Sequence, residues 1–222
     1  MEFLSRSVPL YGEEGVARLQ SKTVLVFGLG GVGAACAEAL VRAGVGKLIF
    51  VDGDTYSVTN KNRQLYAVES TLGENKARVA ARRAREINPA VGAEAREVFY
   101  VAGADFDFGG ADFICDCIDD VAAKLDIISR ANELNVPIIS AMGAGGKLDP
   151  ARFRVADISK THTCPLAKKM RVELRRRGIL HLPVVFSDEV SAAVSVPPSS
   201  VSFVPPVMGF VMAGYVVNTL IS

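Results

Sequence analysis

TVLVFGLGGVG, the stretch Thr23–Gly33, joins a short apolar run to a cluster of glycines. The apolar run is rich in β-branched residues and predicts a buried β-strand. Gly28, Gly30 and Gly33 then have the spacing G-x-G-x-x-G, which lets the backbone turn tightly and approach a phosphate closely. Val32–Gly44 predicts a helix whose N-terminus would face the bound anion. The stretch therefore predicts a nucleotide-binding turn, with a purely structural turn as the alternative.

The rest of the chain continues this alternation of strands and helices. Lys47–Val51 (KLIFV) predicts a second buried strand and completes a β-α-β unit with a right-handed crossover. Further strands are predicted over Ala93–Val101, Asp112–Cys117, Val136–Ala141, Phe153–Ile158 and Pro183–Ser187, and further helices over Glu74–Ile87, Val121–Leu134, Leu166–Arg177 and Val207–Ile221. This order is typical of an α/β fold with a Rossmann-type, doubly wound, mainly parallel sheet. We expect a single domain over residues 1–222, with a nucleotide-binding core over about 21–150 and C-terminal strands and a helix over 151–222.

Composition indicates an ordinary globular protein. Half of the 222 residues are hydrophobic, 22% are charged, and the net charge is +1, so the total charge points to no polyanionic partner. The four cysteines include no C-x-x-C pair, which argues against a zinc knuckle, and Cys115 and Cys117 fit small core positions on one face of a strand. The first residues lack the charged-then-apolar pattern of a signal peptide, so we expect a reducing, cytoplasmic location.

The apolar segment Val201–Ile221 is nearly long enough to span a bilayer. Pro205 and Pro206 near its start restrict the expected helix to about Val207–Ile221, which is short for a span. A buried core helix is therefore expected, and a membrane partner is not. Ser195–Ser202 (SVPPSSVS) is expected to be a loop that leads into this helix.

Two aspartates follow the second strand. Asp52 ends this strand about twenty residues after the glycines, where a carboxylate can accept hydrogen bonds from ribose hydroxyls. This position suits NAD and ATP equally well. Asp54 has two open roles, as a metal ligand or as a cap of the loop.

The segment after these aspartates distinguishes the two nucleotides. Thr59, Asn60 and Arg63 follow the second strand, and Lys76 opens the next helix. A site that expels pyrophosphate needs such cations because negative charge builds on the β- and γ-phosphates, whereas a dehydrogenase has no such need. The alternative is that Arg63 and Lys76 are solvated surface charges.

Asp119 stands at the end of the fourth predicted strand. A carboxylate there can bind Mg²⁺ through ATP phosphates, or it can cap the helix that starts near Val121. Asp120 suits the capping position better, which leaves Asp119 free for a metal ion.

These positions together resemble the ubiquitin-activating-enzyme-like superfamily, also described as ThiF/MoeB/HesA. Its pattern is G-x-G-G-x-G, an acidic strand end, N-x-x-R-Q, a lysine about a dozen residues on, and an aspartate before a helix. The matching residues here are Gly28, Gly30, Gly31, Gly33, Asp52, Asn60, Arg63, Gln64, Lys76 and Asp119. The resemblance covers Arg6 to about Pro150 and implies binding of ATP with Mg²⁺ and adenylation of a carboxylate.

Within the superfamily the chain is most similar to the branch that dehydrates threonylcarbamoyladenosine in tRNA. The supporting segments are Gly143–Pro150 (GAGGKLDP), Asp157–Thr161 (DISKT) and Ser202–Gly209 (SFVPPVMG). This resemblance implies tRNA carrying threonylcarbamoyladenosine as the substrate. One alternative is adenylation of the C-terminal glycine of a ubiquitin-like sulfur carrier, against which the missing zinc pairs argue. An NAD-dependent dehydrogenase is a second alternative. A catalytically silent binding scaffold is a third, against which the full set of phosphate-directed residues argues.

The resemblance also implies partners. In the superfamily an N-terminal arginine reaches the ATP phosphates of a partner subunit, so Arg6 implies a homodimer, with a disordered terminus as the alternative. Cys164 lies where some relatives carry a nucleophile, although the dehydratase reaction requires none. A sulfur-relay partner and a monovalent cation beside the site stay open.

Two groups of basic residues on predicted helices have an open role, as RNA contacts or as solvated helix faces. The residues are Arg78, Arg82, Arg83 and Arg85 on one helix, and Lys168, Lys169, Arg171, Arg175, Arg176 and Arg177 on another.

Overall fold

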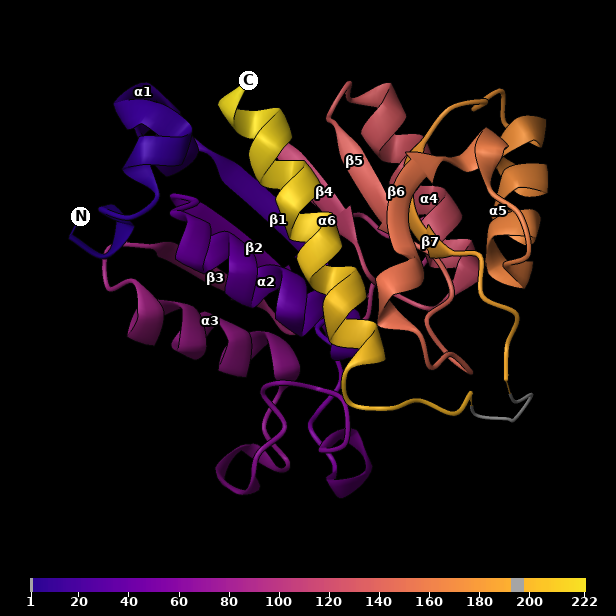
Figure 1. Cartoon of the computed structure of the whole chain (residues 1–222), viewed down its shortest axis with the longest axis horizontal. Helices are drawn as coiled ribbons and strands as arrows, with labels where there is room; N and C mark the ends of the chain where they lie inside the picture. The colour runs from indigo at the N-terminus through magenta and orange to yellow at the C-terminus, as the bar shows by residue number, and fades with distance from the viewer. Residues whose placement is uncertain (1, 193–197) are drawn as a thin grey trace.

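The computed structural model, which describes residues 2–192 and 198–222, contains one seven-stranded sheet with helices on both faces (Figure 1). The strands are β1 (Thr23–Phe27), β2 (Lys47–Val51), β3 (Gly92–Arg96), β4 (Phe113–Asp116), β5 (Ile138–Ala141), β6 (Phe153–Asp157) and β7 (Pro183–Ser187). Their order is β3-β2-β1-β4-β5-β7-β6, and all neighbours are parallel except β6 and β7. The predicted Rossmann-type α/β fold is therefore confirmed.

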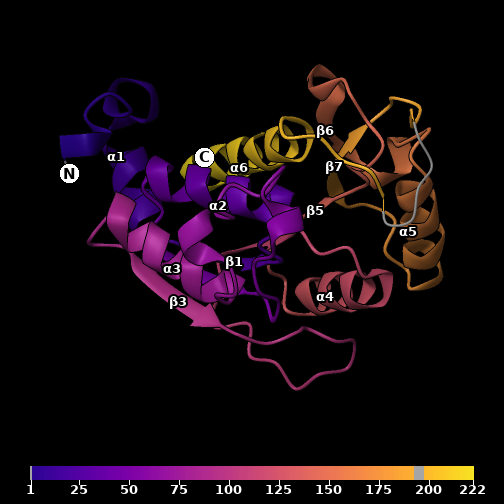
Figure 2. The same ribbon diagram turned by 90° about the horizontal axis from the view of Figure 1, so that it is seen from below.

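The helices form two layers. They are α1 (Val8–Ser21), α2 (Gly31–Ala43), α3 (Lys76–Ile87), α4 (Val121–Glu133), α5 (Pro165–Arg176) and α6 (Val204–Ile221). One apolar cluster joins α2, α3 and α6 to the sheet, and a second joins α4 and α5 to the opposite face (Figures 1 and 2). Along β1, Val24 and Val26 belong to the first cluster, and Leu25 and Phe27 belong to the second. The strand is buried on both sides because successive side chains point to opposite faces.

Helix α6 begins one turn earlier than the sequence predicts. Pro205 and Pro206 lie in its first turn, where a backbone N–H has no partner inside the helix, so proline is tolerated there. Among the described helices only α6 is long and apolar enough to cross a membrane, yet ten of its residues are buried. It packs on α2 so closely that a Cβ on Gly209 would lie 2.2 Å from the Val32 carbonyl oxygen. The prediction of a core helix is confirmed.

Three other segments differ from expectation or lie outside the structure. The predicted strand Ala93–Val101 ends at Arg96, because β2 ends at Val51 and offers no partner to residues beyond. The sequence analysis did not predict α1. The helical backbone of α1 is interrupted by a kink at Gly12, which has a φ of 73°. Of the loop predicted over 195–202, residues 195–197 lie outside the described part of the chain.

Candidate functional site

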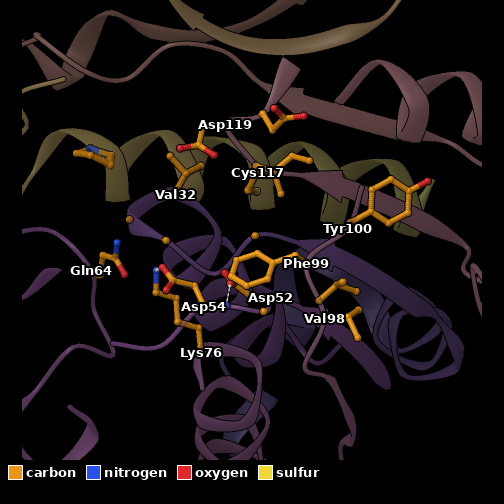
Figure 3. Close-up of a pocket in the computed structure, with 18 of the residues that line it drawn as sticks. Val32, Asp52, Asp54, Gln64, Lys76, Val98, Phe99, Tyr100, Cys117 and Asp119 are labelled. Atoms are coloured by element: carbon orange, nitrogen blue, oxygen red, sulfur yellow. Dashed lines mark hydrogen bonds and ion pairs between the residues drawn. The ribbon is translucent and has the colours of Figure 1, made fainter. Parts of the chain in front are cut away.

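A cavity of about 360 Å³ opens at the carboxyl ends of β1, β2 and β4. The strand order reverses here, since β1 leads to β2 on one side and pairs with β4 on the other. Open α/β sheets bind ligands at such a point. The residues that line it include Gly28, Gly30, Gly31, Asp52, Asp54, Arg63, Gln64, Lys76, Phe99, Cys117, Asp119 and Pro205. Figure 3 shows Asp54 beside Lys76 on one wall and Asp119 with Cys117 on the other.

The glycine turn places free backbone N–H groups at this cavity. Gly28 has a φ of +83°, which a residue with a side chain rarely adopts. The first hydrogen bond of α2 runs from the Ala34 N–H to the Gly30 carbonyl at 3.0 Å, so the N–H groups of the preceding turn are not used inside the helix. A phosphate is the natural ligand for such a helix N-terminus.

Gly33 does not line the cavity, although the sequence analysis placed it among the nucleotide-binding residues. It lies behind the turn, where a Cβ would be 1.7 Å from the Gly28 carbonyl oxygen. The glycine is therefore required for the helix to approach the strand end, and its role is to shape the turn.

Gly33→Ala is expected to disrupt nucleotide binding, because the new methyl group must push the Gly28 carbonyl out of the turn. We also expect a loss of about 1–3 kcal/mol in the free energy of unfolding, the usual cost of an overpacked position. Gly214→Ala is the matched control, since a Cβ there meets nothing within 4 Å. Calorimetric titration with ATP and urea denaturation measure the two effects, and wild-type ATP affinity in Gly33→Ala would contradict this role.

Asp52 ties the glycine turn to β2. Its Oδ2 accepts a hydrogen bond from the Leu29 N–H at 2.6 Å, and its Oδ1 accepts one from the Asp54 N–H at 2.9 Å. Burial raises the pKa of Asp52, and these two N–H groups oppose the shift. Asp52 lines the cavity, and each carboxylate oxygen can accept a further hydrogen bond, as a ribose acceptor needs.

Lys76 is buried and paired, which excludes the solvated alternative. Its Nζ lies 2.5 Å from Asp54 Oδ2, and only 7% of its side chain is exposed. Burial acts to raise the pKa of Asp54, yet hydrogen bonds from Lys76 and the Thr55 N–H hold that pKa below its usual value. Asp54 therefore positions the ammonium group at the cavity wall, and its Oδ1 also accepts a hydrogen bond from the loop N–H of Thr55 at 2.8 Å, as the predicted loop cap would.

Arg63 lines the cavity, and its charge has no carboxylate partner among residues 2–192 and 198–222. Its guanidinium donates to the Thr59 carbonyl at 3.0 Å and to Asn62 Oδ1 at 2.8 Å. Beside it, Gln64 is buried at 7% exposure, and its Oε1 has no hydrogen-bond partner among the described residues. This buried amide oxygen can accept a hydrogen bond from a ligand in the cavity.

Thr59 and Asn60 do not line the cavity, although both were predicted to bind the nucleotide. Asn60 Oδ1 instead accepts a hydrogen bond from the Ser57 N–H at 3.0 Å and so caps the short turn Val58–Asn60. Thr59 is exposed and offers its carbonyl to Arg63. The segment reaches the cavity through Arg63 and Gln64, whereas Asn60 stabilises the loop itself.

The two aspartates after β4 have different roles. Asp120 Oδ1 accepts a hydrogen bond from the Ala123 N–H at 2.8 Å and caps α4, as predicted. Asp119 is exposed, lines the cavity and has no side-chain partner within the described residues. Its carboxylate is therefore available to a cation.

A buried ion pair supports the floor of the site, and the sequence analysis did not identify it. Lys124 Nζ lies 2.9 Å from Asp116 Oδ2, and both side chains are fully buried. The Ser140 hydroxyl donates to the same oxygen at 2.6 Å, and Lys124 donates to the Ile118 carbonyl at 3.1 Å. The available signal was an acidic residue within the apolar run Phe113–Ile118.

Two further cavity residues were also missed. Phe99 leaves the sheet after β3 and packs over Gly53, with its side chain 70% exposed. Cys117 was predicted to be a core residue, but it is only partly buried and lines the cavity, whereas Cys115 is fully buried.

Arg6 lies away from this cavity. It is exposed and stands beside Asn88, Pro89 and Ala90, which connect the end of α3 to the amino end of β3. The cavity lies at the carboxyl ends of the strands, whereas Arg6 lies near their amino ends. Arg6 therefore cannot reach the cavity of its own chain.

Comparison with known proteins gives consistent results. The ThiF family profile matches residues 4–222. The chain is 40% identical to the tRNA threonylcarbamoyladenosine dehydratase of Bacillus subtilis, over 98% of this chain and 94% of that protein. It is 36% identical to the enzyme of the same name from Escherichia coli, over 81% and 71% of the two chains. The crystal structure of the E. coli tRNA N6-threonylcarbamoyladenosine dehydratase in complex with ATP superimposes with a TM-score of 0.92, at 32% identity over 99% and 93%.

Proposed function

The chain belongs to the ThiF family, and we propose that it is an ATP-dependent dehydratase of threonylcarbamoyladenosine in tRNA. The observation that carries this proposal is the meeting of the glycine turn with Arg63, Lys76 and Asp119 around one cavity. In a protein so similar to tRNA dehydratases, this arrangement supports nucleotide activation of a carboxylate. A dehydrogenase has no use for two cations at the phosphate end of its nucleotide.

The reaction begins when the carboxylate of the threonylcarbamoyl group attacks the α-phosphate of ATP. The bond from the α-phosphorus to the bridging oxygen breaks, and pyrophosphate leaves. The carbamoyl group then attacks the activated carbonyl, AMP departs with the bonding electron pair, and the carbamoyl group loses a proton. The net change in the base is the loss of one water. ATP is needed because hydroxide is a poor leaving group and AMP a far better one.

The residues of this chain divide that work. The glycine turn binds phosphate, and Asp52 orients the ribose. Arg63 and Lys76 stabilise the charge that grows on the departing pyrophosphate. Asp54 keeps Lys76 at the cavity wall through their 2.5 Å contact.

Asp119 is the residue that fits Mg²⁺. Protein sites for ATP-bound Mg²⁺ use one or two carboxylates and leave the remaining positions to phosphates and water. Asp119 has an unmatched carboxylate at the cavity, whereas Asp54 is engaged by Lys76. When bound, the ion would neutralise charge on the phosphates.

Four free cysteines, with no disulfide among the described residues, support a reducing, cytoplasmic setting.

Pyrophosphate release from ATP is expected only with tRNA that carries threonylcarbamoyladenosine. The same tRNA transcribed without modifications is the matched control, because it keeps the shape and charge but lacks the carboxylate. A coupled phosphate assay measures the release, and Asp119→Asn is expected to lower the rate and to raise the Mg²⁺ concentration needed. ATP binding without release on either tRNA would contradict the proposed substrate and favour another carboxylate.

We further propose a homodimer in which Arg6 reaches the phosphates of the partner subunit. Arg6→Ala and Arg63→Ala are then each expected to be inactive alone and to regain activity when mixed. After random exchange of equal amounts, about half of the dimers are mixed, and one of the two sites in each mixed dimer has both arginines. The expected rate is therefore about a quarter of the wild-type rate. Rate measurement after mixing tests this, with size-exclusion chromatography as the control for assembly. No recovery after verified subunit exchange would contradict a shared site.

A further inference from the structure

The two basic helices differ in whether their charges are matched. Three of the four arginines of α3 are paired with carboxylates, in the ion pairs Arg78–Glu97 at 2.6 Å, Arg82–Glu74 at 2.7 Å and Arg83–Glu38 at 3.2 Å. Arg85 donates to backbone carbonyls. This helix therefore has little free charge to offer a partner.

Among the described residues, Arg176 is the one cation around α5 that has a carboxylate partner. Across the described residues, the Lys and Arg side chains without a hydrogen bond or ion pair are Arg6, Lys160, Lys168, Lys169, Arg175 and Arg177. All but Arg6 lie within residues 160–177, and all are exposed. Residues 158–177 include only one acidic residue, Glu173, and it pairs with Arg176 at 2.8 Å. We call Lys160, Lys168, Lys169, Arg175 and Arg177 the α5 basic face.

Helix α5 leads away from the edge of the sheet that carries the nucleotide cavity. Its N-cap, Cys164, lies against the turn after β5, where a Cβ on Gly143 would be 3.4 Å from Cys164 Sγ. Helix α4 packs beside α5, and α4 begins directly after Asp119 and Asp120. Figure 2 shows α5 at one end of the molecule with α4 next to it. A long ligand whose tip enters the cavity can therefore continue along α5.

The chemistry of this face suits a nucleic-acid backbone better than a membrane. Helices that lie on bilayers place an apolar face in the lipid. The apolar face of α5, with Ala167, Met170 and Leu174, is buried against the core. The exposed residues of the helix are Pro165, Lys168, Lys169, Val172, Arg175 and Arg176, and the one anion, Glu173, is partly exposed. Exposed, unmatched Lys and Arg side chains bind phosphates and release counterions.

We propose that the α5 basic face binds the phosphate backbone of the tRNA whose modified base enters the cavity. This inference rests on the proposed function and adds where the tRNA lies. The phosphate contacts position the substrate, while the cavity performs the chemistry. Loss of these charges therefore weakens tRNA binding without slowing the reaction of bound tRNA.

The test compares two variants of the whole chain that each lose four positive charges. The first carries Lys168→Gln, Lys169→Gln, Arg175→Gln and Arg177→Gln, and the second carries Arg42→Gln, Lys47→Gln, Arg78→Gln and Arg82→Gln. The control cations are exposed and ion-paired. Binding of tRNA carrying threonylcarbamoyladenosine is measured by fluorescence anisotropy at several salt concentrations, together with KM, kcat, ATP affinity and melting temperature.

For the α5 variant we expect KM for tRNA to rise about tenfold or more, with kcat and ATP affinity unchanged. The slope of log Kd against log salt concentration is expected to become shallower by about 3, since each lost phosphate contact removes roughly 0.7–0.9. The control variant is expected to change KM by less than about twofold. Equal effects in both variants, or a wild-type KM in the α5 variant, would overturn the α5 assignment alone. A wild-type chain that turns over no modified tRNA would overturn the proposed function, and this inference with it.

Discussion

Arg63→Ala is expected to lower the rate of pyrophosphate release about 10²–10³-fold, the usual cost of removing one charge-stabilising donor from an active site. Arg63 is half-buried at the cavity wall and donates to a backbone carbonyl and an amide oxygen. Its positive charge is therefore unmatched until triphosphate arrives. Since charge on the leaving group grows in the transition state, most of the loss should appear in kcat.

Lys61→Ala is the matched control for Arg63. Lys61 lies two residues away, is exposed, pairs with Glu69 at 2.5 Å and does not line the cavity. We expect a nearly unchanged rate in this variant. Single-turnover kinetics with both variants measures the difference, and equal rates for the two would refute the role assigned to Arg63.

Lys124→Met is expected to lower the free energy of unfolding by about 3–5 kcal/mol, because it leaves the Asp116 carboxylate buried without its counter-charge. Both side chains are fully buried, and the N–O distance is 2.9 Å. The same lysine anchors the Ile118 carbonyl just before Asp119. Activity is therefore expected to fall together with stability.

The double variant Lys124→Met with Asp116→Leu separates the two effects. Replacing both partners removes the unpaired charge, so most of the lost stability should return. The anchor on Ile118 stays absent, so activity should recover less than stability does. Urea denaturation provides the stability measurement, and a single variant as stable as the wild type would show that the pair does not support the fold.

Local patterns predicted most of the sheet because strands such as β1, β2 and β4 are short apolar runs with glycine or aspartate at a boundary. The β-α-β unit around Gly28–Gly33 and the strand Pro183–Ser187 were located nearly to the residue. The errors came from tertiary context. Strand β3 stops where β2 stops, and α6 accepts two prolines because they occupy its first turn. Neither the end of β3 nor the start of α6 can be predicted from a short stretch of sequence around it.

The site was predicted in part for a similar reason. The motif spacing predicted that the glycine turn, Asp52, Arg63 and Lys76 lie at one site, and all of them line one cavity. They meet there because the carboxyl ends of parallel strands lie on the same side of the sheet. It could not separate residues that face the cavity from those behind it, such as Asn60. Nor could it pair Lys124 with Asp116, because their contact depends on how α4 packs on β4.

The most direct test of the proposed reaction is mass spectrometry of the nucleosides from modified tRNA after incubation with the protein, ATP and Mg²⁺. We predict that threonylcarbamoyladenosine loses the mass of one water, with one AMP and one pyrophosphate formed for each base converted. Arg63→Ala should leave the nucleoside unchanged. An unchanged nucleoside with the wild-type protein, under conditions where ATP is bound, would contradict the proposed function.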